Sequence, residues 1–102
     1  NPRNFILAVA VASALAAGLS WAADHGARVA NISFEGVSSS STVRTAADYM
    51  RRRSRIVFAA AGNGGTASSI PPSPSILIVS ATDPSDMLRS FSDYGGFVDV
   101  AA

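Results

Sequence analysis

Residues Ile56 to Gly65 read IVFAAAGNGG, and this segment indicates the architecture more clearly than any other part of the chain. It is a short apolar run that follows a charged segment and ends in a glycine-asparagine turn. Such a run is typical of a strand buried on both faces, and therefore of a parallel sheet. Asn63 then stands at the carboxyl end of the strand, where open α/β sheets bind their ligands. Its side-chain amide can donate a hydrogen bond into such a site, as an oxyanion donor does.

Two other interpretations of this turn are open. Asn63 can simply occupy a left-handed position between Gly62 and Gly64, as asparagine often does. The glycines can also belong to a phosphate-binding loop, but such a loop must open into a helix. Here the proline-rich segment TASSIPPSPS follows, and the chain contains no lysine, which argues against a nucleotide site.

The rest of the chain predicts alternating strands and helices. We expect helices at 13–25 and 41–54, and strands at 5–11, 28–34, 56–61, 76–81 and near 97–101. This order is typical of an α/β fold with parallel strands. The second helix is the best marked, because serines precede it and an apolar stripe follows helical spacing: Val43, Ala46, Ala47 and Met50.

Composition limits the chain to one domain with a modest core. It has 102 residues, of which 48% are hydrophobic and 15% are charged, with a formal net charge of +1. The absence of cysteine excludes disulfides and thiolate metal sites. Four arginines crowd the end of the second predicted helix: Arg51, Arg52, Arg53 and Arg55. They complement the helix dipole and lack the interleaved aromatics of a single-strand nucleic-acid site, so no nucleic-acid partner is expected.

The segment FILAVAVASALAA at 5–17 allows two interpretations. Its apolar run after Arg3 is similar to a secretory signal peptide. The β-branched residues up to Val11 instead favour a strand, and the residues after them recur at helical spacing. As a membrane span the segment is interrupted by Ser13, Gly18 and Ser20, so no membrane partner is expected.

Several segments, in this order, resemble the subtilisin-like serine proteases, the subtilase or peptidase S8 family. The resemblance runs from Trp21 to Ala102 through WAADHGARVANISFEG, TVRTAADYM, AAAGNGG, IPPSPS, ILIVSATD and SFSDYGGFVDVAA. The alanine-glycine-asparagine element and the last segment are its specific parts. The resemblance implies a three-layer α/β fold, a mostly parallel sheet flanked by helices. It also implies that residues 1–102 are an internal fragment of a single subtilase-like catalytic domain, as the start at Asn1 suggests.

The same resemblance implies a parent protein that hydrolyses peptide bonds by acyl transfer to serine. Asn63 matches the asparagine whose side chain stabilises the tetrahedral oxyanion. Two segments match the walls of the substrate cleft: Ser33, Phe34, Glu35 and Gly36 on one side, and Ala60, Ala61 and Gly62 on the other. Glu35 stands where the family usually has glycine. Its carboxylate either narrows the cleft or favours a basic substrate side chain by charge complementarity.

The catalytic triad of the family is not expected within this chain. Asp24-His25-Gly26 falls where a helix ends, and Gly26 is a natural left-handed cap. Four further aspartates have no histidine partner and are expected in turns and at strand ends: Asp83, Asp86, Asp93 and Asp99. The fragment alone is therefore predicted to be inactive.

The alternative is a non-catalytic protease-like module that binds peptides or serves structure. In either case the expected partner is a polypeptide, with no metal or other cofactor in the fragment. The family resemblance allows calcium in the parent protein and suggests a secreted or extracytoplasmic location.

Overall fold

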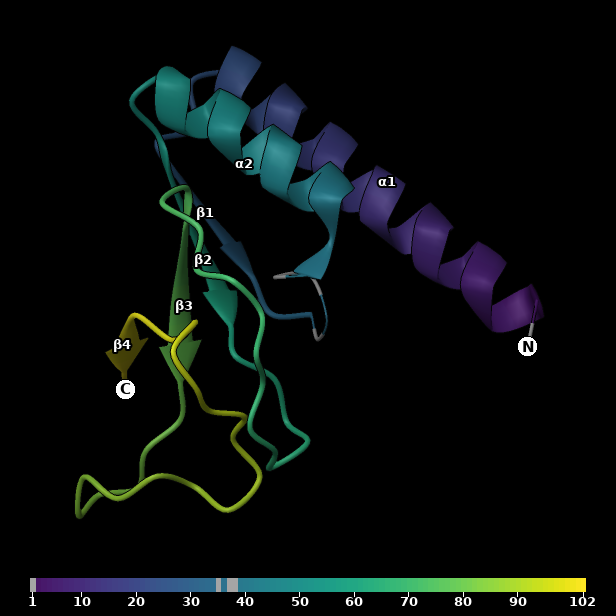
Figure 1. The fold of residues 1–102 in the computed structure, drawn as a ribbon. Helices are drawn as coiled ribbons and strands as arrows, with labels where there is room; N and C mark the ends of the chain where they lie inside the picture. The colour runs from purple at the N-terminus through teal and green to yellow at the C-terminus, as the bar shows by residue number, and fades with distance from the viewer. Residues whose placement is uncertain (1, 35, 37–38) are drawn as a thin grey trace.

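The computed structural model describes residues 2–34, 36 and 39–102. The elements follow one another as α1 (Pro2–Asp24), β1 (Val29–Ile32), α2 (Ser41–Arg52), β2 (Ile56–Ala60), β3 (Ile76–Ser80) and β4 (Val100–Ala101). The strands form one parallel four-stranded sheet in the order β1-β2-β3-β4 (Figure 1). The α/β class with a parallel sheet, expected from the sequence, is confirmed.

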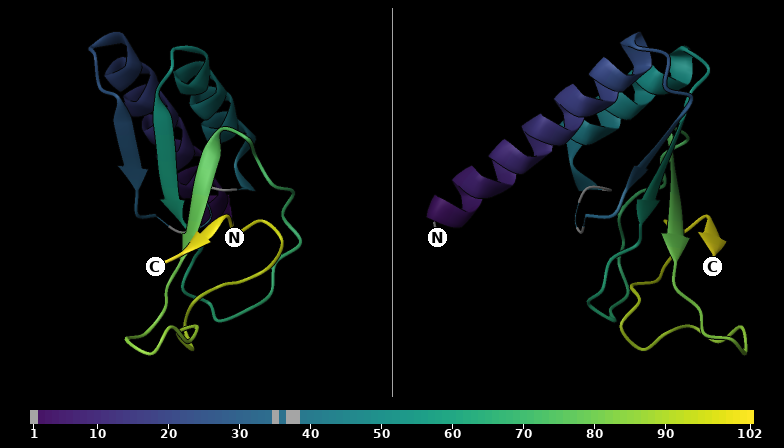
Figure 2. Two further views of the ribbon diagram at one scale, coloured as in Figure 1. Left: turned by 90° about the vertical axis from the view of Figure 1, so that its left-hand side faces the viewer. Right: turned by 180° about the vertical axis from the view of Figure 1, so that it is seen from behind.

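Both helices lie on the same side of the sheet (Figure 2). Most strand positions that face them are buried, and the register aligns Ile32, Ala59 and Ile78 on this side. The opposite face carries the alternate strand positions and is partly open, with Val29 60% and Val100 46% exposed. No helix in the described part of the chain covers that face, so the chain supplies two of the three expected layers.

Helix α2 begins where the sequence predicts, because Ser40 caps it. The Ser40 hydroxyl oxygen accepts a hydrogen bond from the Val43 N–H at 3.3 Å, as is typical of an N-cap. The helix was expected over 41–54 but ends at Arg52. Ser54 has a left-handed φ of 60° and donates its N–H to Arg51 O at 2.9 Å, which stops the helix and turns the chain into β2.

The strand predicted at 5–11 is wrong, because these residues belong to α1. Alanine and leucine favour a helix, and neither proline nor glycine separates 5–11 from the helical residues that follow as far as Gly18. The β-branched residues favour a strand only where a neighbouring strand packs against them. The C-terminal half of α1 packs into the core through Leu19 and Ala23. Among the described helices, none combines the length and hydrophobicity needed to cross a bilayer.

Strand β4 is shorter than the predicted 97–101. The N–H of Ile78 donates to the carboxylate Oδ2 of Asp99 at 2.8 Å, and the N–H of Asp99 donates back to Ile78 O at 2.9 Å. Because a side chain replaces the main-chain acceptor, the regular ladder with β3 begins only at Val100. Phe97, expected in the strand, lies in the core instead and is 2% exposed.

Candidate functional site

Asn63 lies just beyond the carboxyl end of the internal strand β2. The ladder continues to Ala61, which donates its N–H to Val79 O at 2.9 Å. Gly62 then has a φ of 119° and Gly65 a φ of 65°, so the chain turns sharply on both sides of Asn63. Asn63 itself does not have a positive φ. The simple explanation of Asn63 as a left-handed turn residue is therefore wrong, and the glycines adopt that conformation instead.

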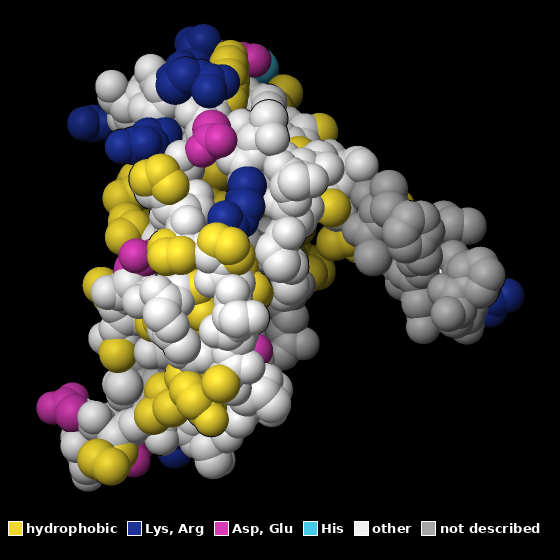
Figure 3. All heavy atoms as spheres, viewed as in Figure 1, with side chains coloured by type: hydrophobic (Ala, Val, Ile, Leu, Met, Phe, Trp, Pro, Cys, Tyr) yellow, Lys and Arg dark blue, Asp and Glu magenta, His cyan; other side chains and the backbone are white. Residues whose placement is uncertain are grey.

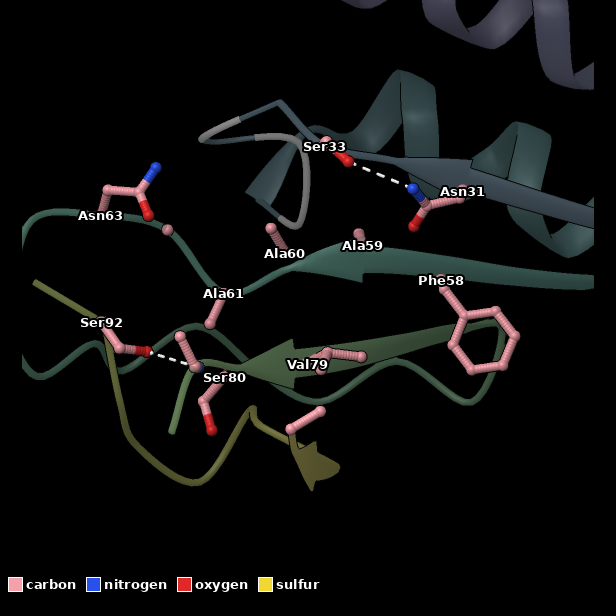
Figure 4. Close-up of a pocket in the computed structure, with 13 residues that line it drawn as sticks. Asn31, Ser33, Phe58, Ala59, Ala60, Ala61, Asn63, Val79, Ser80 and Ser92 are labelled. Carbon is pink, nitrogen blue, oxygen red and sulfur yellow. Dashed lines mark hydrogen bonds between the residues drawn. The ribbon is translucent and has the colours of Figure 1, made fainter. Parts of the chain in front are cut away.

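A cavity of about 360 Å³ opens beside Asn63, around β1, β2, β3 and the loops that follow them (Figure 4). It brings together five of the residues predicted for the site: Ser33, Ala60, Ala61, Gly62 and Asn63. Phe34 and Gly36 are exposed and do not line the cavity, and Glu35 lies outside the described residues. Five lining residues are polar, two asparagines and three serines, and the others are glycine or apolar residues.

Asn31 is a polar lining residue that the sequence analysis missed. Its Nδ2 donates a hydrogen bond to Ser33 Oγ at 3.1 Å (Figure 4). Residues two positions apart on a strand point to the same face of the sheet. Once Ser33 is assigned to the site, this alternation alone predicts that Asn31 lies beside it.

Ser92 is a second residue that was missed. It is 2% exposed, accepts a hydrogen bond from the Ala81 N–H at 3.0 Å and donates its hydroxyl to Asp93 O at 3.1 Å. It thereby ties the segment after β3 to a later loop beside the cavity. No local pattern in SFSDYG distinguishes this buried serine from the exposed Ser90 two residues earlier.

Two of the aspartates occupy turns and strand ends, as expected. Asp83 Oδ1 accepts hydrogen bonds from the N–H groups of Ser85 at 2.8 Å and Met87 at 3.0 Å. Asp99 lies immediately before β4, as described above. Within the described residues, no group of three His, Asp or Glu side chains comes together as a set of metal ligands.

The interpretation of Asp24-His25-Gly26 as a helix end is confirmed. Helix α1 ends at Asp24, Gly26 has a φ of 89°, and Ala27 donates its N–H to Ala22 O at 2.9 Å. The ring of His25 stacks on Trp21 with 4.0 Å between centroids, and its Nδ1 lies 2.7 Å from Trp21 O. These contacts belong to the helix terminus, and His25 does not line the cavity beside Asn63.

Basic side chains gather where the two helices end (Figure 3). Arg51 and Arg52 are exposed in the last turn of α2. Arg53 lies 3.6 Å from the Asp24 carboxylate of α1 and donates a hydrogen bond to the Tyr49 hydroxyl at 3.1 Å. The cluster therefore complements a helix terminus and links the two helices at the surface, where such ion pairs contribute little stability.

Comparison with known proteins identifies relatives of the chain. The profile of the Subtilase family, Peptidase_S8, matches residues 11–102. Thermitase from Thermoactinomyces vulgaris is 41% identical to this chain over an alignment of 111 residues. The alignment covers 99% of this chain and 40% of thermitase. Subtilisin Savinase from Lederbergia lenta is 38% identical over 92 residues, which cover 88% of this chain and 34% of that protein.

Solved structures agree with the sequence relatives. The crystal structure of a cold adapted subtilisin-like serine proteinase matches with a TM-score of 0.77 and 30% identity, over 89% of this chain and 35% of that chain. The chain thus spans 40% or less of the length of these relatives. Because the sequence profile, the relatives and the fold agree over most of its length, the chain belongs to the subtilase family, peptidase S8.

Proposed function

We propose that the protein containing this chain is a serine endopeptidase, and that the chain contributes its oxyanion donor and the walls of its substrate cleft. The observation that carries the proposal is the position of Asn63, directly after an internal parallel strand and at the rim of a cavity of about 360 Å³. The names of its relatives, among them a thermophilic serine proteinase from Bacillus sp. strain AK1, support the same reaction class.

Asn63 acts on the charge that develops during acyl transfer. When the serine oxygen attacks the peptide carbonyl carbon, negative charge forms on the carbonyl oxygen, and the Asn63 amide donates a hydrogen bond to it. A donor that is already fixed in position before the reaction needs no reorganisation as this charge appears. The interaction is strongest in the transition state, so it raises kcat more than it strengthens substrate binding.

The substrate lies in the cleft as an extended peptide. Its main chain pairs with residues 33–36, which follow β1 at the edge of the sheet, and one side chain enters the cavity. Ala60, Ala61 and Gly62 leave room for that side chain because they are small. On the wall formed by 33–36, the carboxylate of Glu35 favours a basic substrate side chain. A peptide library cleaved with no preference for lysine or arginine would contradict this part of the proposal.

The catalytic serine, histidine and aspartate come from parts of the protein outside this chain, so the isolated chain has no peptidase activity. A secreted location completes the proposal and rests on the family resemblance, which also allows calcium in the parent protein.

The test uses the full-length protein encoded by the reading frame that contains this chain. We expect it to hydrolyse a chromogenic peptide and to react with a fluorophosphonate at one serine, and we expect labelling to abolish hydrolysis. The isolated chain 1–102 is the control and should show neither reaction. A full-length protein that binds the peptide but neither cleaves it nor reacts with the fluorophosphonate would instead be a peptide-binding module, and the proposal would be refuted.

A further inference from the structure

The loop that carries Asn63 is held by a segment from the far end of the chain. Residues 90–95 run alongside residues 62–68, and the main chains exchange hydrogen bonds over this length. The N–H of Gly65 donates to Phe91 O at 2.9 Å, and the N–H of Asp93 donates to Gly62 O at 2.9 Å. The turn around Asn63 is therefore supported by a second loop and does not stand alone.

The Asp93 carboxylate lies against the backbone on both sides of Asn63. Its Oδ1 accepts hydrogen bonds from the N–H of Thr66 at 3.1 Å and from the Thr66 hydroxyl at 3.3 Å. A Cβ placed on Gly62 would collide with Oδ2, and a Cβ placed on Gly64 would lie 3.1 Å from Oδ1. The carboxylate thus occupies the space that side chains at the two glycines flanking Asn63 would need.

From these contacts we infer that Asp93 is a positioning residue, which fixes the backbone of 62–64 and thereby aims the Asn63 amide into the cleft. The inference rests on the proposed function, since it assumes that Asn63 is the oxyanion donor. Asp93 does not line the cavity, so it acts through the loop and does not touch the substrate. Small displacements of a donor are costly, because a shift of about 1 Å can lower a rate on the order of 100-fold.

The test is a set of variants in the full-length protein, with kcat expressed per active site titrated by a fluorophosphonate. Asp93→Ala removes the acceptor and the bulk beside the glycines, and we expect kcat to fall roughly 10- to 100-fold with little change in KM. Asp93→Asn keeps both the shape and an acceptor oxygen, and we expect it to retain most of the native kcat. Asp83→Ala is the matched control, because it removes a carboxylate that also accepts two hydrogen bonds within a loop, remote from the Asn63 turn.

A double-mutant cycle with Asn63→Ala isolates the positioning role from general stability. If Asp93 acts through Asn63, then Asp93→Ala should change kcat little once the Asn63 amide has been removed. Additive losses would overturn the inference, as would a native kcat for Asp93→Ala. Equal losses in the alanine and asparagine variants would assign the effect to the charge and overturn the geometric role. A native kcat for Asn63→Ala would refute the proposed oxyanion donor itself, a result distinct from these.

Discussion

At the residue scale, the turn after β2 depends on glycine at position 62. Gly62 combines a φ of 119° with a position where a Cβ would collide with the Asp93 carboxylate. We expect Gly62→Ala to destabilise the full-length protein by about 1–3 kcal/mol, and to lower kcat because the loop must shift. Gly96→Ala is the control, since a Cβ there meets no atom within 4 Å. Equal unfolding temperatures for the two variants would contradict this account of the turn.

Asn63 and Asp93 differ in how far the sequence could predict their roles. Asn63 is predicted as a site residue because the segment AAAGNGG belongs to the family resemblance, whereas the strand and the glycines alone also allow an ordinary turn residue. Asp93 was expected only as a turn residue, because its partner Thr66 lies 27 positions away and no short pattern links them. The sequence therefore indicates the proposed donor, Asn63, but not Asp93, which we infer to support it.

At the scale of elements, the N-cap of α2 is the clearest local determinant. Ser40→Ala removes the acceptor of the Val43 N–H, and we expect it to lower the free energy of unfolding by about 1 kcal/mol. Ser41→Ala, one residue inside the helix, should cost much less. The comparison is made by chemical denaturation of the full-length variants, and a cap variant as stable as its neighbour would count against the assigned role of Ser40.

The elements also show why sequence patterns succeed or fail. Helix α2, β2 and β3 were predicted within two residues at each end, because caps and turns mark their limits. The segment 5–11 was assigned to a strand, but strand formation depends on a neighbouring strand that the sequence alone does not reveal. The start of β4 depends on the Asp99 side chain, whose bond to the Ile78 N–H spans 21 positions.

At the scale of the whole molecule, the sheet face opposite the two helices is the surface most prone to association. Val29, Ile56 and Val100 remain exposed on it, by 60%, 37% and 46%. Exposed apolar surface of this kind promotes association. We expect the isolated chain 1–102 to bind a hydrophobic dye and to self-associate, and the full-length protein to do neither.

Lysine substitutions can test whether self-association depends on this face of the sheet or on apolar surface elsewhere. Ile56→Lys should reduce self-association of the isolated chain. It should destabilise the full-length protein, in which we expect a further layer to cover this position. Met87→Lys is the control, because Met87 is 64% exposed in a loop away from the sheet. Light scattering on the isolated chain and thermal unfolding of the full-length protein give the two readouts. Tolerance of Ile56→Lys in the full-length protein would mean that the face stays open there.

The measurement that bears most directly on the proposed role of Asn63 is the steady-state kinetics of Asn63→Leu in the full-length protein. Leucine has a similar volume but cannot donate a hydrogen bond to the oxyanion. Loss of such a donor from a subtilisin is the established example, roughly 10²- to 10³-fold in kcat, and we adopt that magnitude. We therefore predict a fall of this size in kcat with KM nearly unchanged. A variant with the native kcat would contradict the assignment of Asn63 as the oxyanion donor.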